Sequence, residues 1–428
     1  MNILGIETSC DETAAAIIKD GRQILSNVVV SQIDIFKAYG GVIPEVAARS
    51  HLEAIQPVID QAFEQAGFLK DDQPDWDKID AIAVTHTPGL LGSLLVGTLT
   101  ARTLAILHNK PLYATHHLKS HIYATWLTPE KLGKSEDFQQ RKATAARVAK
   151  QPGAKGVVEN LSDLPTFPVL SLVVSGGHTQ IIYMPAHNTF EIIGTTRDDA
   201  VGECFDKVAK ILGLPYPGGP AISKAAEHGD PKKYPLPRPK LSTPTRGTTA
   251  YSDLDFSFSG LKTAVLRAVQ KELNKPISFP SHQLAHLLTD QQIADFAASF
   301  EQTAVDILLE KLTQATKTHP ANSIVIAGGV SANQRLREEA SRIFSQHEAS
   351  DKKTLTKIQQ RKATAAQVAK QPGAKGVAES SVKVFFPEVK FSGDNAAMVA
   401  AAAFYEIQSG VKPTDPYSLN IFPRSAIS

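Results

Sequence analysis

Short apolar runs alternate with amphipathic segments along the chain, and this pattern predicts an α/β protein. Residues 2–30 are typical of two or three short strands around a polar hairpin turn. Residues 79–84 form a buried-strand run, followed by a turn and a long apolar helix with Arg102 inside it, too polar for a membrane span. Residues 112–115 predict a strand that leads into a histidine-bearing helix. A further helix is predicted over residues 44–66, with an apolar face made of Val46, Ala47, Leu52, Ile55, Val58, Ile59 and Ala62.

The same order of elements returns later in the chain. A strand–turn–strand pattern near residues 3–18 is repeated over 169–183, and a strand–turn–helix pattern over 79–107 is repeated over 323–344. We therefore predict one α/β fold used twice, as two lobes with a central cleft. Glycine turns at the strand ends should face that cleft, where open α/β sheets bind ligands. The predicted lobes are residues 1–109 plus 388–428, and residues 110–387.

Two segments do not follow this duplication. Residues 139–157 and 359–377 are nearly identical and differ only at Arg147 and Gln367. They contain five and four basic residues and no acidic residue; without them, 36 basic residues stand against 43 acidic ones. The slight basicity of the chain therefore says little about its core. We expect two inserted surface loops; the alternative is a pair of basic arms that bind RNA.

Composition narrows the class of protein. A chain of 428 residues is long enough for two lobes. It has only two cysteines, which excludes a disulfide framework and fits a reducing compartment. Residues 2–6 form a strand-like run without a basic leader. We expect a cytoplasmic protein with no membrane partner.

Two histidines and a distant aspartate form the strongest candidate site. His117 and His121 are four residues apart, so a helix would place them on one face. Together with Asp394 they would make a metal site with open coordination positions. His116 should point elsewhere. In zinc peptidases a Glu directly follows the first ligand, but Leu118 stands there, which disfavours a peptidase of that class.

Several glycine-rich turns favour a ligand that carries phosphate. Each lacks Cβ atoms where backbone N–H groups could approach an anion, and three such turns together favour nucleotide binding over plain hairpins. Asp206, on a predicted helix, could accept ribose hydroxyls or could pair with Lys207 or Lys210. Asp11 and Glu12 could orient a nucleophile or could simply stabilise their turn. The basic, proline-rich residues 231–246 predict an extended loop, either an RNA contact or a connector.

Eight motifs in order over nearly the whole chain resemble the bacterial TsaD family, the tRNA N6-adenosine threonylcarbamoyltransferases once called glycoproteases. The motifs are residues 5–13 (GIETSCDET), 39–45 (YGGVIPE), 88–90 (PGL), 117–121 (HLKSH), 174–179 (VSGGHT), 255–263 (DFSFSGLKT), 328–333 (GGVSAN) and 394–395 (DN). The resemblance implies the two-lobed ribonuclease H-like fold of actin, Hsp70 and sugar kinases. One departure is Lys119, at a position where the family commonly has a carboxylate; by spacing it should point away from the metal.

The resemblance also implies an activity and a ligand set. Family members transfer the threonylcarbamoyl group from threonylcarbamoyl-AMP to N6 of adenosine 37, in tRNAs that read codons beginning with A. The implied metal is Fe²⁺, with Zn²⁺ as the alternative, held by His117, His121 and Asp394. Asp11 and Glu12 are candidates for the catalytic base. The implied substrate-binding residues are Val173, Val174, Ser175, Gly176, Gly177, Asp206, Gly219 and Asn333.

The implied partners are tRNA through its anticodon loop, a paralogous protein with the same ATPase fold, and a small P-loop ATPase. Two other hypotheses remain at the level of the sequence. The His-x-x-x-His spacing allows a metallopeptidase, and the fold alone allows a nucleotide-binding scaffold without catalysis.

Overall fold

The structure is a computed structural model that describes residues 1–129, 164–238, 252–344 and 382–427. Both near-identical segments, 139–157 and 359–377, lie outside these ranges, as does the basic proline-rich loop after residue 238. Their predicted surface positions therefore stay predictions.

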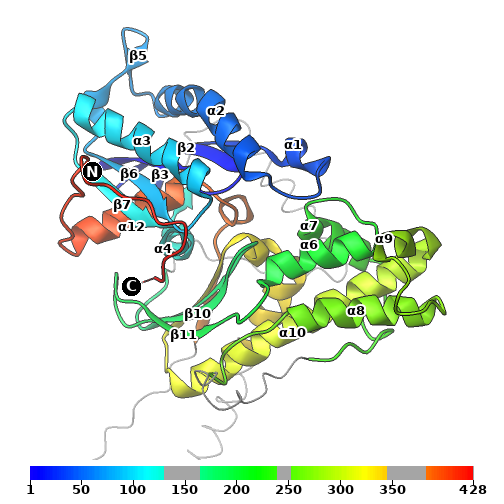
Figure 1. Ribbon diagram of the computed structural model, residues 1–428. Coiled ribbons are helices and arrows are strands. Elements are labelled where there is room, and N and C mark those ends of the chain that lie inside the picture. Colours follow the sequence, from blue (N-terminus) through cyan, green and yellow to red (C-terminus); the bar gives the residue numbers. More distant parts are fainter. Residues whose placement is uncertain (130–163, 239–251, 345–381, 428) are drawn as a thin grey trace, which may run out of the picture.

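The first sheet has six strands in the order β7-β6-β1-β2-β3-β8 (Figure 1). β1 pairs antiparallel with β2 and parallel with β6, while β2 continues antiparallel to β3 and β6 parallel to β7. The strands are β1 (Asn2–Glu7), β2 (Glu12–Lys19), β3 (Gln23–Ser31), β6 (Ala81–Thr87), β7 (Leu112–His116) and β8 (Thr128–Pro129).

The second sheet repeats this arrangement with five strands in the order β11-β10-β9-β12-β13. Its first three strands are antiparallel neighbours, and its last two continue in parallel beyond the first. Apart from β8, both sheets therefore have the order third-second-first-fourth-fifth, which confirms the predicted duplicated, two-lobed α/β fold. The strands are β9 (Val169–Val174), β10 (Thr179–Met184), β11 (Glu191–Thr195), β12 (Ser323–Ala327) and β13 (Lys383–Phe385).

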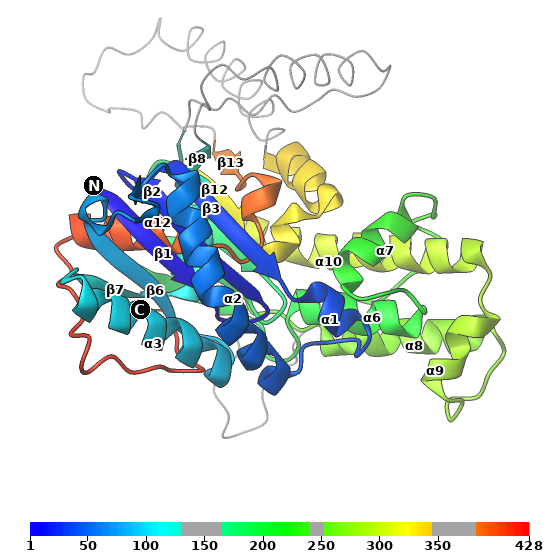
Figure 2. The same cartoon turned by 90° about the horizontal axis from the view of Figure 1, so that it is seen from above.

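Helices cover both sheets and also lie between them (Figures 1 and 2). α2 (Pro44–Gln65) and α3 (Leu91–Leu107) share a core with the outer face of the first sheet. α6 (Val201–Ile211), α8 (Ser259–Glu272) and α10 (Asp290–Thr318) do the same for the second sheet. α4 (His117–Tyr123) and α12 (Ala396–Gln408) belong to a core that both sheets line. The candidate site is carried by these two central elements.

The close fit of α12 against the first sheet follows from small side chains. Six of the eight residues of α12 that precede Phe404 are alanines, in the sequence AAMVAAAAFYEIQ. A Cβ at Gly5 of β1 would lie 2.2 Å from the Ala396 carbonyl oxygen, so only glycine permits this approach. The loop before α12, which carries Asp394, is thereby held close to the end of β1.

The predicted face of the 44–66 helix is wrong at one residue. Ala47, Ile55, Val58, Ile59 and Ala62 are buried, but Leu52 is 65% exposed. Apolar spacing alone could not separate Leu52 from its neighbours, because the width of the covered face depends on where the sheet and α3 lie.

The sheet pairing does not follow the predicted lobe boundary after residue 109. β7 and β8 follow that residue and yet pair with the first sheet. The first sheet therefore continues to residue 129, because β7 is the fifth strand of the common order and β8 adds a further strand beside β3. The return of the chain to the first lobe after β13 agrees with the packing of α12 on β1 and β2.

Candidate metal centre and substrate cleft

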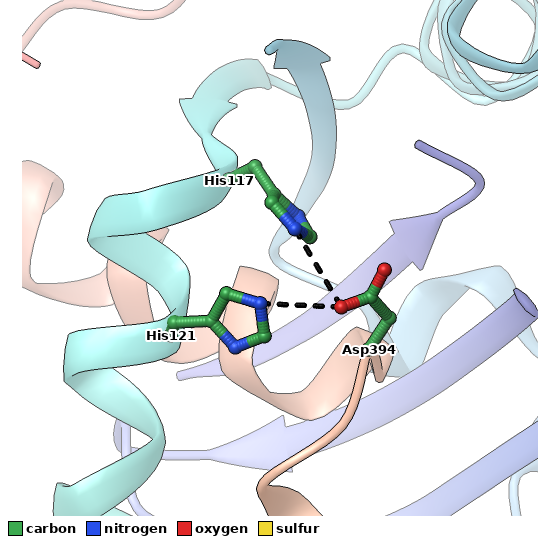
Figure 3. Close-up of side chains that lie close together, drawn as sticks. All are labelled: His117, His121 and Asp394. Atoms are coloured by element: carbon green, nitrogen blue, oxygen red, sulfur yellow. Dashed lines mark ion pairs between the residues drawn. The ribbon is translucent and has the colours of Figure 1, made fainter. Parts of the chain in front are cut away.

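α4 presents two imidazoles on one side. The side chain of His116 caps the helix, since its Nδ1 accepts a hydrogen bond from the Leu118 N–H at 3.2 Å. His117 and His121 follow one helical turn apart, with ring centres separated by 4.6 Å. Figure 3 shows both rings facing Asp394. The spacing thus places the pair as predicted, and His116 is not part of the cluster.

Asp394 reaches the histidines from the loop before α12. Asn395 fixes this loop, because its Oδ1 accepts from the Met398 N–H at 3.1 Å and its Nδ2 donates to the Gly393 carbonyl at 2.9 Å. Asp394 Oδ1 lies 3.2 Å from His121 Nε2 and 3.5 Å from His117 Nε2 (Figure 3). The side chain of Asp394 keeps 18% exposure, so the cluster is open to a ligand at this point.

The two separations between Asp394 and the histidines suit a common cation, and all three donor atoms lie within 4.8 Å of one another. Two donor atoms that bind one ion at about 2.1 Å lie about 3.0 Å apart at a right angle and about 3.4 Å apart at a tetrahedral angle. His121 Nε2 is buried and makes no hydrogen bond within the described part of the chain, although Asp394 is near. A buried imidazole nitrogen normally has a partner. Two imidazoles and one carboxylate form the donor set of a metal site with open positions.

A buried carboxylate behind His117 supports this geometry. Glu7 Oε2 lies 3.3 Å from His117 Nδ1 and accepts from the Thr85 hydroxyl at 2.6 Å, while Oε1 accepts from the Ser9 N–H at 2.5 Å. Such a carboxylate commonly orients a metal-binding histidine through its second nitrogen. Sequence reasoning did not single out Glu7. The available signal was a lone acidic residue at the end of an apolar strand.

The charges of the cluster do not balance without a cation. Burial opposes protonation of His117, but the Asp394 and Glu7 carboxylates raise its pKa to about 9. Burial would raise the pKa of Asp394, but His117 and His121 lower it to about 2. Burial and the charge on His117 also lower the pKa of His121. The carboxylates of Glu7 and Asp394 thus share one imidazolium, and a divalent cation would compensate the remaining negative charge while displacing the proton.

The turn after β9 offers free backbone donors. A Cβ at Gly176 or Gly177 would meet no atom within 4 Å, so both residues border open space. Within the residues that the structure describes, neither of their N–H groups has an acceptor. Ser175 closes the turn through its N–H to the His178 carbonyl. The side chains of Val173 and Val174 are fully buried, so only their backbone could reach a ligand.

One carboxylate oxygen of Asp206 is engaged by a backbone N–H group. Asp206 Oδ1 accepts from the Gly218 N–H at 2.7 Å, which fixes the start of α7 (Gly218–Ala226) and leaves Oδ2 for a ligand. The suggested pairing of Asp206 with Lys207 is wrong, because that ammonium binds Asp199 and Glu203. Gly219 borders open space at the first turn of α7.

Asp11 and Glu12 lie at the turn between β1 and β2. Burial, followed by the charges of Asp394 and Asp11, raises the pKa of Glu12 well above its ordinary value. Burial, followed by Asp11 and Asp206, also raises the pKa of Tyr216. Charges from the first lobe therefore act on groups of the second, which indicates that the Asp11 turn and the Asp206 helix face the same space between the lobes.

Lys119 takes no part in the cluster. Its ammonium lies over the Phe190 ring, 4.9 Å from the ring centre. The lysine at this position, where the family commonly has a carboxylate, therefore leaves the two imidazoles unobstructed.

Comparison with known proteins identifies the family. The family model described as TsaD, tRNA N6-adenosine threonylcarbamoyltransferase, matches residues 23–135 and 154–356. This chain belongs to that family. A relative of that name from Thermomicrobium roseum is 41% identical over 419 residues, covering 96% of this chain and 93% of the relative. One from Bacillus subtilis is 39% identical over 414 residues, covering 96% and 92%.

A solved structure shows the same fold at low identity. T. kodakarensis HypF has a TM-score of 0.50 and 12% identity, with 96% of this chain aligned to 48% of HypF. At such identity the likeness concerns the fold alone, and it agrees with the actin-like, two-lobed arrangement of the TsaD family.

Proposed function

We propose that this protein transfers the threonylcarbamoyl group from threonylcarbamoyl-AMP to N6 of adenosine 37, in tRNAs that read codons beginning with A, with release of AMP. The observation that carries the proposal is the meeting of His117, His121 and Asp394 beside free glycine N–H groups, in a chain of this family.

His117, His121 and Asp394 hold a divalent metal, which we assign as Fe²⁺ with Zn²⁺ as the alternative, because this donor set serves both ions. When bound, the metal supplies Lewis acidity toward the acyl-adenylate. Glu7 keeps the His117 ring in its binding orientation through the Nδ1 contact of 3.3 Å. The exposed edge of Asp394 leaves room for the substrate.

The glycine turns bind the adenylate. The Gly176 and Gly177 N–H groups donate to phosphate or acyl oxygens, where negative charge grows as the amine attacks. Asp206 Oδ2 accepts a ribose hydroxyl, and Gly219 allows the nucleotide to approach α7. Asn333 has a positioning role, because its amide already binds Glu301, Ser223 and the Leu336 N–H.

The N6 amine must lose a proton during the transfer, and the Asp11–Glu12 turn supplies the acceptor. The raised pKa of Glu12 means that it keeps its proton at higher pH than a free carboxyl. We assign Asp11 as the acceptor, with Glu12 beside it. Asp11→Asn should lower kcat at least 100-fold with metal content unchanged, whereas Glu12→Gln should lower it less. Equal losses in the two variants, or loss of metal from Asp11→Asn, would contradict this assignment.

The chain acts with partners in the cytoplasm. These are the tRNA anticodon loop, a paralogous ATPase-fold protein and a small P-loop ATPase. Leu91, Leu95 and Leu99 are exposed on α3 and provide a surface for the paralogue. Among the described residues, no helix combines the length and apolar character that crossing a membrane demands.

Reconstitution tests the function directly. The protein, its partner proteins, ATP, threonine, bicarbonate, the adenylate-forming enzyme and unmodified tRNA should together yield the modified nucleoside, detected by mass spectrometry. His121→Ala and Asp394→Ala should lose bound metal and product together while remaining folded. Full activity of folded His121→Ala would support a scaffold without catalysis instead.

The metallopeptidase hypothesis has less structural support. Leu118, in place of a catalytic Glu, is packed in the core. The nearest acid behind the histidines, Glu7, is fully buried and engaged by Thr85 and Ser9. If the protein cleaved a glycoprotein and His117→Ala abolished this cleavage, the metallopeptidase hypothesis would be favoured over the transferase.

A further inference from the structure

The C-terminal residues form a strap across the first lobe, fixed at both ends. At its start, the Thr414 N–H donates to the Leu112 carbonyl at 2.7 Å, which extends the edge of β7. Near its end, Ile427 is buried in the core between the two sheets. Figure 1 shows this red segment running from α12 past α3 to the region of α4. Residues between the two anchors are therefore held in place, although most of them are exposed.

Further hydrogen bonds fix the strap beside the candidate site. The Thr87 hydroxyl donates to the Phe422 carbonyl at 2.6 Å, and the Gly89 N–H donates to the Pro423 carbonyl at 3.2 Å. His116 Nε2 lies 3.4 Å from the Ser425 carbonyl. Because His116 Nδ1 accepts from a backbone N–H, its proton resides on Nε2 and is donated to the strap. The residue that caps the metal-binding helix thus also holds the chain directly after Arg424, and the Gly89 N–H holds it directly before.

A cavity of about 310 Å³ opens under this part of the strap. It is lined by residues of three segments that are distant in sequence: Pro88, Gly89, His178, Gln180, Pro423, Arg424 and Ser425. His178 belongs to the turn that carries the free glycine N–H groups. Burial and the charges of His117 and His121 lower the pKa of His178 to about 4, which places this neutral ring within electrostatic reach of the metal centre. The cavity therefore opens to the surface beside the turn that carries these glycine N–H groups.

Arg424 is the cation at this opening. It makes no ion pair or hydrogen bond through its side chain with any residue that the structure describes, and it is exposed. The other titratable group of the lining is His178, which is neutral at physiological pH. An unpaired guanidinium at the rim of a polar opening, on a backbone held on both sides, is suited to bind a phosphate, because its planar N–H groups match two phosphate oxygens.

We infer that Arg424 binds a backbone phosphate of the RNA and so positions the target nucleotide at the cavity beside the Gly176–Gly177 turn. The inference rests on the proposed function for the identity of the polynucleotide. An RNA phosphate fits better than the phosphate of the adenylate, because Arg424 lies on the exposed outer rim, whereas the adenylate must reach the buried imidazoles. The strap thereby becomes part of the tRNA-binding surface.

Binding measurements on the protein with its partner proteins test this. We expect Arg424→Gln to weaken binding of unmodified tRNA about tenfold and to reduce the slope of log Kd against log salt by about 0.7–0.9, the loss of one phosphate contact. Arg424→Lys should keep the slope and lose less affinity. Lys412→Gln is the matched control, since Lys412 is exposed on the same segment but does not line the cavity.

A second readout separates the two sources of phosphate. A sulfamoyl analogue of threonylcarbamoyl-adenylate should bind Arg424→Gln within about twofold of the wild type. Loss of analogue affinity with unchanged tRNA affinity would overturn the inference and assign Arg424 to the nucleotide. Unchanged tRNA affinity and salt slope in Arg424→Gln would also overturn it, while a wild type that binds tRNA but yields no modified nucleoside would instead overturn the proposed function.

Discussion

Asn333 and Glu7 illustrate how the role of a single residue depends on its bonding partners. The Asn333 amide has both of its hydrogens donated, to Ser223 and Glu301, and its oxygen accepts from the Leu336 N–H. A motif match suggested a ligand contact, but the observed bonds indicate that Asn333 shapes the turn. Glu7 shows the reverse case: the sequence suggested no role for this strand residue, and yet it contacts His117. Sequence gives the residue type, and only the neighbours give the role.

Glu406 on α12 is a buried carboxyl that should make stability depend on pH. Burial raises its pKa to about 7, and the charge of Lys119 offsets only part of this effect. The native state therefore favours the protonated form, so stability is greatest below the unfolded pKa and is lost as pH rises toward 7. Glu406→Gln should raise the free energy of unfolding at pH 8 by up to about 3 kcal/mol, at about 1.4 kcal/mol per pKa unit.

Urea unfolding at pH 5 and pH 8 measures this prediction. The difference between variant and wild type should be small at pH 5 and large at pH 8. An equal difference at both values would show that Glu406 acts through packing rather than through its charge.

At the scale of elements, the caps and small residues explain why α4 and α12 can carry a site between two sheets. The side chains of His116 and Asn395 cap the N-termini of α4 and α12, and Gly5 lets α12 approach β1. The element types and approximate bounds of β1, α2, β9 and β12 followed from periodicity. The short α4 was identifiable only because its histidines are four residues apart.

The exposed face of α3 yields a prediction about the paralogous partner. Leu91, Leu95 and Leu99 are exposed at intervals of four residues and so lie along one side of the helix. Leu52 of the adjacent α2 is also exposed. Such a stripe is typical of a protein–protein interface. Leu95→Asp should weaken binding of the paralogue at least tenfold and leave the melting temperature nearly unchanged, because an exposed side chain contributes little to stability.

Leu107→Asp provides the control for that experiment. Leu107 is exposed at the end of the same helix, about two turns beyond Leu99, and at 3.6 residues per turn it is rotated by about 120° from Leu95, the middle of the stripe. Its variant should bind the partner normally in calorimetry or analytical ultracentrifugation. Equal weakening by both variants would indicate a general effect on α3 and not a specific interface.

At the scale of the whole molecule, the candidate metal joins segments that are nearly three hundred residues apart in the chain. His117 and His121 come from α4, and Asp394 comes from the loop before α12, in the layer that both sheets cover. An ion bound there stabilises only the folded arrangement. Such binding adds about 2.7 kcal/mol to the free energy of unfolding when free metal is at 100 times its Kd.

Metal removal should therefore lower the melting temperature of the wild type by several degrees. Dialysis against a chelator, followed by scanning calorimetry and return of Fe²⁺ or Zn²⁺, measures the effect and compares the two ions. Asp394→Ala should show no change on the same treatment. If chelation lowers the metal content of the wild type but leaves its melting temperature unchanged, the bound metal does not stabilise the fold.

The sequence by itself determined the local features of this protein. Period-two and helical patterns placed the strands and helices, their repetition predicted two similar lobes, and the four-residue spacing put two imidazoles on one face. These features depend on residues near one another in the chain, so periodicity and spacing are enough to find them.

Only the tertiary structure decided the features that join distant segments. It set the strand order, brought Asp394 to 3.2 Å from His121, placed Glu7 behind His117, left Leu52 exposed and laid Arg424 over the cavity. Each depends on how sheets and helices pack, and packing is a sum over many weak contacts that no short pattern encodes. The chemistry of the site was visible in residue types, whereas its assembly required the fold.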